Sequence, residues 1–271
     1  MSTTFGFIGT GNITSAIIPS LLASGFSKSE ELYIYDIDLE KTKSLKNKYS
    51  LNIALNIKQL AQFSDVIIIA VKPFALECVL QELSIHLDNQ IIISTVAGVT
   101  IEEILTSIKT PIKLARIMPN IGAIVGESMT ALVSTNLYEL ELETVHKFLL
   151  SFGKYITLDE GLFNEFTTLC GSSPAFFADI LKSFISYGVM NGMDEESVRY
   201  MVISTLQGTA KVLMSTNLSE QHLISKVATK GGTTEAGINV MRKNNLDIIL
   251  RDAFKATTKK GQDLSIRSNK T

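Results

Sequence analysis

Two glycines near the start of the chain have the spacing of a phosphate-binding turn. The apolar run Phe5–Ile8 leads into Gly9-Thr10-Gly11-Asn12, and a helical pattern follows at once. A glycine at the first position allows a tight turn from strand to helix. A glycine at the second lets the backbone approach a pyrophosphate at the partly positive start of the helix. The pattern therefore predicts that a dinucleotide cofactor is bound by Gly9, Thr10, Gly11, Asn12 and Ile13.

An acidic residue follows the next β-rich run at a fitting distance. Asp36 has the spacing at which a carboxylate accepts hydrogen bonds from the adenosine ribose hydroxyls. This favours NAD over NADP, although Lys41 and hydroxyl side chains nearby could still receive a 2′-phosphate. The alternative is that Asp36 only caps a turn. The sequence thus predicts NADH or NADPH as the cofactor, with Asp36 at its ribose.

A third segment, Ala70-Val71-Lys72-Pro73, ends an apolar run that begins at Val66. In a doubly wound sheet, ligands bind beyond the carboxyl ends of the strands. We therefore expect Ala70, Val71, Lys72 and Pro73 to touch the cofactor. Pro73 has no amide hydrogen and ends the strand, which leaves Lys72 at the edge of the crevice, facing a phosphate or solvent.

Such residues need a parallel sheet to bring them together. Short β-rich runs alternate with amphipathic segments in the first half of the chain, which is typical of βαβ units. Strands are predicted at Thr4–Ile8, Glu31–Tyr35, Val66–Val71, Ile91–Thr95, Lys113–Ile117, Ser128–Val133 and Lys154–Thr157. Helices are predicted at Ser15–Ser24, Leu39–Tyr49 and Leu140–Leu150. The fold class is α/β, with a Rossmann-type doubly wound sheet as the dinucleotide-binding domain over residues 1–158.

After about Leu158 the strand signals stop, and residues 159–271 predict an all-α domain. A helix with Pro174 at its first position and a serine cap is expected to run to about Met190, before a second helix that begins near Asp194. The second helix is apolar on more than one side, which predicts packing across a dimer interface. Its apolar residues include Met201, Ile203, Leu206, Val212 and Leu213.

The composition limits the other classes of function. With 25 basic and 27 acidic residues the net charge is −2, and no long run of one sign would attract nucleic acid. The apolar runs are far shorter than the roughly 20 residues that span a bilayer, and a strand from Thr4 leaves no room for a signal peptide. Cys78 and Cys170 are too few for a disulfide framework or a cysteine metal site, and we expect both in the core. A soluble, cytoplasmic protein without a metal site is expected.

Five motifs spread over nearly the whole chain resemble the pyrroline-5-carboxylate reductase family. They are Gly9-x-Gly11-Asn12, Ala70–Pro73, Arg116-Ile117-Met118-Pro119-Asn120, Cys170–Phe176 and Gly231–Gly237. The Gly-Gly-Thr-Thr element at Gly231 is the most specific of them. The resemblance implies a reductase that converts the cyclic imine 1-pyrroline-5-carboxylate to L-proline, the last step of proline biosynthesis. It also implies NADPH or NADH as cofactor, and a homodimer or larger homo-oligomer built through the helical domain.

The resemblance also implies roles for single residues. Thr234 would hydrogen-bond the ring nitrogen as the catalytic residue, and the turn amides of Gly231, Gly232, Thr233 and Thr234 would hold the substrate carboxylate. Asn120 would line the pocket beneath the nicotinamide, and Arg116 would brace that loop. The alternative is that Thr233 or Thr234 only caps a helix.

A cyclic imine is basic enough to arrive largely protonated, so no strong acid is required. None of the three histidines, His86, His146 and His222, sits in a motif, and all are expected at the surface.

Several positions depart from the usual pattern of the family. Ile121-Gly122 stand where Thr-Pro is common, and Ser128 and Ser173 replace usual glycines. Two other functions therefore stay open. One is a related dehydrogenase with a different small substrate, for which Lys230 is the nearby candidate acid. The other is a divergent, non-catalytic member that binds a nucleotide or a partner without turnover.

Overall fold

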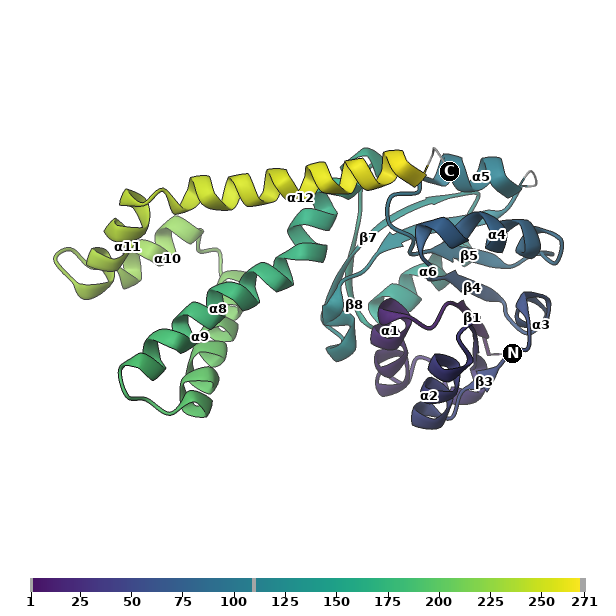
Figure 1. Ribbon diagram of the computed structural model, residues 1–271, viewed down its shortest axis with the longest axis horizontal. Coiled ribbons are helices and arrows are strands. Elements are labelled where there is room, and N and C mark those ends of the chain that lie inside the picture. Colours follow the sequence, from purple (N-terminus) through teal and green to yellow (C-terminus); the bar gives the residue numbers. More distant parts are fainter. Residues whose placement is uncertain (1, 109–110, 269–271) are drawn as a thin grey trace. The chain divides into compact units, whose positions relative to one another are not determined.

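The computed structural model describes residues 2–108 and 111–268. The chain divides into two compact units, one made of Met1–Gly171 with Thr258–Thr271 and the other of Ser172–Thr257 (Figure 1). The first unit holds a sheet and the second is helical. The predicted division into domains 1–158 and 159–271 stays a prediction.

In the described residues, eight strands form one sheet in the order β3-β2-β1-β4-β5-β6-β7-β8. Their bounds are β1 Phe5–Ile8, β2 Leu32–Tyr35, β3 Asn52–Ile53, β4 Val66–Ile69, β5 Ile91–Ser94, β6 Lys113–Met118, β7 Ser128–Thr135 and β8 Gly153–Thr157. All neighbours are parallel except β6 and β7, which are antiparallel. The order in which the chain starts at β1 and winds outward in both directions is the predicted doubly wound topology.

Helices cover both faces of the sheet. Successive residues of a strand point to opposite faces, so each strand contributes side chains to two cores. Phe5 and Phe7 of β1 face one core, and Ile8 faces the other. The first core is closed by α1 (Asn12–Ala23), α2 (Leu39–Tyr49) and α6 (Glu139–Leu150). The second is closed by α3 (Ile57–Gln62), α4 (Pro73–Ser84) and α5 (Ile101–Ile108). Burial on both faces explains the continuous apolar runs of these strands.

The strand predictions agree with the structure within a few residues, with two differences. The short strand β3 is missed, because two residues carry no periodic pattern. The strand β7 runs antiparallel, whereas a parallel sheet is predicted. Only the short η2 turn (Ile121–Val125) and its flanks connect β6 to β7, and a parallel crossover needs a dozen or more residues.

The chain after β8 is helical throughout the residues described. Its elements, in chain order, are the short 3₁₀ turn η3 (Glu160–Leu162), α7 (Phe163–Phe166), the π-helix η4 (Thr167–Ser172), α8 (Ser173–Met190), α9 (Glu195–Ser215), α10 (Glu220–Val227), α11 (Thr233–Lys243) and α12 (Leu246–Ser268). The short 3₁₀ turn η1 (Ser29–Glu31) precedes β2. The end of α8 and the Asp194 cap of α9 agree with the prediction, since the Asp194 side chain accepts from the Ser197 amide.

The predicted serine cap of α8 is wrong. Ser172 precedes the helix with helical backbone angles and makes no side-chain cap bond. The π-helix η4 runs directly into α8, so Pro174 follows an earlier turn instead of opening a free helix end. A cap is needed only where the first amides lack partners.

The core position predicted for both cysteines is wrong for Cys78, which is exposed. The helix α4 buries Leu76, Leu80 and Leu83 at helical spacing, and Cys78 falls on the opposite side. Cys170 is half-buried, and burial raises the pKa of its thiol.

The surface position predicted for the histidines holds for His222. His86 and His146 are half-buried, and the ring of His146 stacks on Tyr155 with centroids 4.9 Å apart. This pairing joins α6 to β8, two elements whose contact the local sequence does not reveal.

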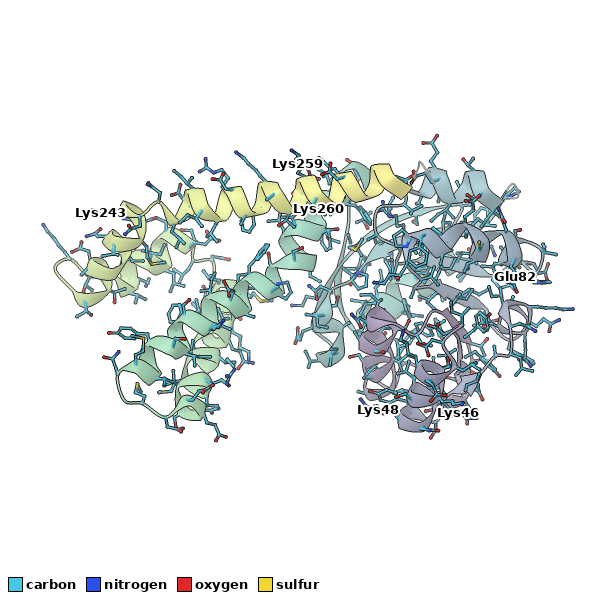
Figure 2. All side chains as sticks on the ribbon, viewed as in Figure 1. Lys46, Lys48, Glu82, Lys243, Lys259 and Lys260 are labelled. Carbon is cyan, nitrogen blue, oxygen red and sulfur yellow. The ribbon has the colours of Figure 1, made fainter. Side chains whose placement is uncertain are left out.

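Charged side chains are spread over the outer faces of the helices. Lys46 and Lys48 project from α2 and Glu82 from α4, and Lys243 is exposed in α11 (Figure 2). Over residues 2–108 and 111–268, no helix combines the length and the apolar character needed to cross a membrane. The same ranges hold no group of three or more His, Cys, Asp or Glu side chains arranged to bind a metal ion.

Candidate active site

Three strand ends meet at one level of the sheet, and each is followed by a predicted cofactor residue. Ile8, the last residue of β1, is paired with the last residues of β2 and β4. Gly9, Asp36 and Ala70 come next on these strands. Because the strands are parallel, the three residues gather at the carboxyl edge, where sheets of this topology bind ligands.

Gly9 makes a turn that residues with a side chain would strain. Its φ is +101°, and an added Cβ would lie 2.5 Å from the Ala70 carbonyl oxygen. Its amide donates to the Tyr35 carbonyl at 2.8 Å. Thr14, at the third glycine position of the usual motif, is buried and donates from Oγ1 to the Gly9 carbonyl at 2.6 Å. The turn is therefore held against both neighbouring strands and the first helix.

Gly11 has a different reason to be glycine. It is the N-cap of α1, with φ −78°, and an added Cβ would meet nothing within 4 Å. Nothing inside this unit requires the absence of a side chain there, and the open space leaves room for a ligand to approach the backbone closely. The first turn of α1, from Asn12, contains no acidic residue, and Ile13 packs against the core beneath it. The first amides of the helix are thus available to an anion.

The carboxylate of Asp36 is tied to the glycine turn. Oδ2 accepts from the Thr10 amide at 2.6 Å and from Thr10 Oγ1 at 2.9 Å. Oδ1 accepts from the Asp38 amide at 2.9 Å. Asp36 therefore orders the turn as well as facing the predicted ribose position. The hydroxyl of the buried Thr10 is a site contact that sequence reasoning missed, because its partner lies 26 residues away.

The segment after β4 differs from its prediction in one respect. The strand ends at Ile69, two residues early, and Ala70 still donates its amide to the Ile8 carbonyl at 2.8 Å. Pro73 opens α4 at its first position, after Lys72 as N-cap. Proline suits that position, because its missing amide hydrogen would have no helical partner. Lys72 and Pro73 are exposed at the same sheet edge as Gly9.

Together these residues fit a nicotinamide dinucleotide. A glycine with open space around it, an open helix start and a carboxylate at the end of the second strand are three features typical of sites that bind pyrophosphate and adenosine ribose. The predicted residues Gly9 to Ile13, Asp36 and Ala70 to Pro73 are all brought to this edge.

Asn120 has its side-chain amide fully engaged. Its Oδ1 accepts from the Gly122 amide at 2.9 Å, and its Nδ2 donates to the Cys170 carbonyl in the π-helix at 3.0 Å. Its own amide donates to Ser128 Oγ at 3.1 Å. An added Cβ on Gly122 would lie 2.6 Å from the Glu127 carbonyl oxygen. Two departures from the family pattern, Gly122 and Ser128, thus belong to one interlocked turn, and the substrate contact of Asn120 stays a prediction.

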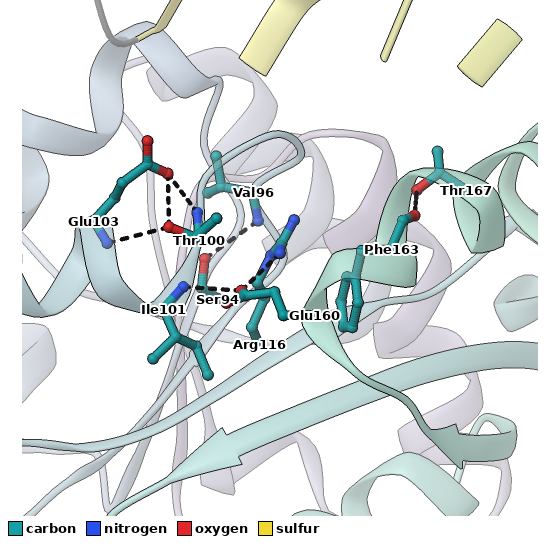
Figure 3. A network of polar contacts seen from close by, with 9 residues as sticks. All are labelled: Ser94, Val96, Thr100, Ile101, Glu103, Arg116, Glu160, Phe163 and Thr167. Carbon is teal, nitrogen blue, oxygen red and sulfur yellow. Dashed lines mark hydrogen bonds and ion pairs between the residues drawn. The ribbon is translucent and has the colours of Figure 1, made fainter. Parts of the chain in front are cut away.

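Arg116 is buried in β6 and braces a different region from the one predicted. Its Nη1 donates to Glu160 Oε1 at 2.7 Å, and the same oxygen accepts from the Ile101 amide at 2.9 Å (Figure 3). The guanidinium lies over the Phe163 ring, 4.4 Å from its centroid. It thereby joins β6 to the start of α5 and to α7, and its link to the Asn120 loop is only through the strand. A buried arginine predicts a carboxylate partner, but no local signal identifies Glu160.

The predicted substrate residues lie at the start of α11. Gly232 is the N-cap, so neither Thr233 nor Thr234 caps this helix, and both are exposed. Gly231 has φ +75°, and its amide donates to Glu235 Oε2 at 2.7 Å. The Gly232 amide donates to the Thr229 carbonyl at 2.9 Å, in an approach that a Cβ would obstruct.

Two of the four predicted anion-binding amides, those of Gly231 and Gly232, therefore have partners within the chain. The amides of Thr233 and Thr234 occupy the first helical positions, where no intrahelical acceptor exists.

Comparison with known proteins matches both parts of the chain. Residues 4–98 match the family described as NADP oxidoreductase coenzyme F420-dependent, and residues 160–264 match pyrroline-5-carboxylate reductase dimerisation. A solved pyrroline carboxylate reductase of Plasmodium falciparum, with NADP bound, superposes with a TM-score of 0.89 at 25% identity, covering 97% of this chain and 98% of that one. The Streptococcus pyogenes 1-pyrroline-5-carboxylate reductase gives 0.86 at 30% identity, covering 96% and 98%.

Curated relatives match at full length as well. The pyrroline-5-carboxylate reductase of Aquifex aeolicus is 32% identical over 262 residues, which are 96% of each chain. That of Staphylococcus haemolyticus is 29% identical, over 96% of this chain and 97% of its own length. The residues at the carboxyl edge of the sheet and the Gly-Gly-Thr-Thr segment at the start of α11 thus occur together in a chain that has the length and fold of these enzymes. The chain belongs to the pyrroline-5-carboxylate reductase family.

Proposed function

We propose that this protein reduces 1-pyrroline-5-carboxylate to L-proline with a hydride from NADH or NADPH. The observation that carries the proposal is that Gly9, Asp36 and Ala70 follow three neighbouring strands and lie together beside the open start of α1. The chain that holds them matches this family over nearly its full length. When bound, the reduced nicotinamide supplies the hydride, which goes to the carbon of the C=N bond while the π electrons move to nitrogen. The protein's own residues bind and orient the reactants.

The cofactor part of the proposal rests on the first unit. Gly11 and the first amides of α1 hold the pyrophosphate, and Asp36 holds the adenosine ribose. Ala70 to Pro73 border the cofactor at the neighbouring strand end. Thr10 keeps the Asp36 carboxylate in place through two hydrogen bonds.

The substrate part rests on the start of α11. The Thr234 hydroxyl oxygen accepts a hydrogen bond from the protonated ring nitrogen of the imine. After the transfer, the hydroxyl donates to the nitrogen of the amine. The amides of Thr233 and Thr234 hold the substrate carboxylate at a helix N-terminus. Those of Gly231 and Gly232 join them only if a substrate displaces Glu235 and Thr229 from their present contacts.

The test follows oxidation of NADH and, separately, of NADPH by the purified protein with 1-pyrroline-5-carboxylate. Thr234→Ala should lower kcat by about tenfold to 100-fold, since a hydrogen bond to a charged group contributes about 1.5 to 3 kcal/mol. Thr144→Ala is the matched control, because that hydroxyl donates to Leu140 within its own helix, α6, and belongs to none of the predicted sites.

Saturable nucleotide binding without turnover would refute the proposal and favour the non-catalytic alternative. Reduction of another small carbonyl substrate, lost in Lys230→Met, would favour the related dehydrogenase instead. Turnover that is lowered in Thr234→Ala and unchanged in Thr144→Ala would establish both the reaction and the role of the threonine.

The helical part supports a further proposal, a homodimer or larger homo-oligomer. Phe177, Phe184, Tyr187 and Met201 leave large apolar side chains exposed on the unit that matches the dimerisation family. We also propose a cytoplasmic location, supported by the exposed free thiol of Cys78, which suits a reducing compartment.

A further inference from the structure

The turn between β2 and α2 surrounds the predicted ribose position with acidic groups. We propose that this turn selects NADH over NADPH, with Asp36 accepting a ribose hydroxyl and Asp38 holding Lys41, so that this cation is not free to receive a 2′-phosphate. The inference rests on the proposed function only in that the chain binds a reduced nicotinamide dinucleotide. It identifies Asp38 as a second specificity-determining residue beside Asp36.

The Asp36 carboxylate can accept one more hydrogen bond from a donor, but it offers nothing to a group that only accepts. A carboxylate has about four acceptor positions. The Thr10 amide and hydroxyl take two of them on Oδ2, and the Asp38 amide takes one on Oδ1. A ribose hydroxyl can donate to the position that is left on Oδ1. A 2′-phosphate has only acceptor oxygens and about two negative charges, so it meets this carboxylate with repulsion alone.

Asp38 occupies the place where α2 could otherwise bind a phosphate. It is the N-cap of that helix, and its Oδ1 accepts from the amides of Glu40 at 3.2 Å and Lys41 at 3.3 Å. The start of a helix attracts anions through such amides. In this protein, a carboxylate of the chain itself satisfies them, so they are not free to bind a phosphate.

The nearest cation is already paired. Lys41 Nζ lies 3.0 Å from Asp38 Oδ2. The hydrogen bond and the charge of Asp38, and more weakly the charge of Asp36, raise the pKa of Lys41. Lys41 would have to leave Asp38 to receive a 2′-phosphate.

The other charged side chains near this turn do not change the expected preference for NADH over NADPH. Lys43 is paired with Glu40 at 3.0 Å. Lys72 follows β4, and β1 lies between β4 and β2, the strand that Asp36 follows. Ile37 follows Asp36 with 90% of its surface exposed, an apolar surface without charge.

The experiment measures the Kd of NADH and of NADPH by calorimetry without substrate, so that it does not depend on turnover. NADH should bind at least about tenfold more tightly than NADPH at low salt, and the ratio should narrow as added salt screens the repulsion. Asp38→Asn keeps a good helix cap while it removes the charge and releases Lys41. It should tighten NADPH binding about threefold to tenfold and leave NADH binding within about twofold.

Two further variants separate the effects of charge and of Lys41. Glu40→Gln removes the same charge from the same helix turn and releases Lys43 instead of Lys41, and both Kd values should stay within about twofold of the wild type. Lys41→Gln alone leaves the Asp38 charge uncompensated and should not tighten NADPH binding, whereas Lys41→Gln added to Asp38→Asn should remove part of the gain.

Equal or tighter binding of NADPH by the wild type would overturn the inference. So would an unchanged ratio in Asp38→Asn, or a gain in NADPH affinity that is fully kept when Lys41→Gln is added to Asp38→Asn, which would show that the release of Lys41 plays no part. Selective NADH binding without reduction of 1-pyrroline-5-carboxylate would refute the proposed function and leave this inference standing. Failure to bind either dinucleotide would refute both.

Discussion

Gly9 and Gly11 are two residues apart, and alanine at each should fail in a different way. At Gly9 the structure itself excludes a side chain, because φ is +101° and an added Cβ would lie 2.5 Å from a backbone oxygen. At Gly11 the backbone angle is ordinary and the space is open. We therefore expect Gly9→Ala to lose stability and Gly11→Ala to lose dinucleotide binding.

The magnitudes follow from these two environments. A side chain in a left-handed or neighbouring region costs about 1–3 kcal/mol, and an overlap with fixed backbone adds about 1–3 kcal/mol. Gly9→Ala should thus cost about 2–6 kcal/mol and lower Tm by roughly 5–20 °C. Gly11→Ala should change the free energy of unfolding by less than about 1 kcal/mol, since a poorer cap offsets the lower entropy of the unfolded chain. Its NADH affinity should fall at least about tenfold, because the methyl group stands where the pyrophosphate approaches.

Thermal denaturation without ligand and calorimetric titration with NADH measure the two effects separately. Gly25→Ala is the control for backbone angle alone, because Gly25 has φ +69° and nothing within 4 Å of an added Cβ. Its loss of stability should be clearly smaller than that of Gly9→Ala. Wild-type NADH affinity in Gly11→Ala would refute the placement of the pyrophosphate, and an unchanged Tm in Gly9→Ala would refute the account of the turn.

Three more outcomes are expected from other parts of the chain. Glu160→Ala should lower the free energy of unfolding by about 3 kcal/mol in denaturant titrations, because it leaves Arg116, whose Nε already lacks a partner in the described residues, as a buried unpaired charge. Lys113 lies 2.7 Å from Glu141 and lowers the pKa of that carboxyl, so the pair's stabilisation should be complete at neutral pH and lost as pH falls through the lowered pKa. In Lys113→Met, the free energy of unfolding should fall less between neutral pH and about pH 3 than it does in the wild type. Light scattering should show an oligomer for the wild type and a smaller species for Phe184→Asp, since Phe184 is 58% exposed; an unchanged mass would place the interface elsewhere.

Local patterns were sufficient for most of the sheet and for the cofactor turn. Strands buried on both faces appear as continuous apolar runs such as Val66–Ile69, and the helices between them have a period that differs from that of a strand. The Gly9 turn could also be predicted, because its backbone angle restricts the residue type at that position alone.

Structure was needed wherever the partner is distant in sequence. Neither the two bonds from Thr10 to Asp36 nor the pairing of Arg116 with Glu160 has a local signature. The serine cap predicted for α8 failed for the same reason, since a preceding π-helix removes the free helix end that makes a cap useful.

The sequence by itself therefore determined seven of the eight strands described, the glycine turn and the acidic residue after the second strand, because backbone angles and burial periods are local properties. Only the tertiary structure decided that Asp36 holds Thr10, that Asp38 holds Lys41 and that Arg116 pairs with Glu160. Hydrogen bonds and ion pairs depend on distances of about 3 Å between side-chain atoms. Those distances are set by how whole elements pack, and packing is a property of the complete fold.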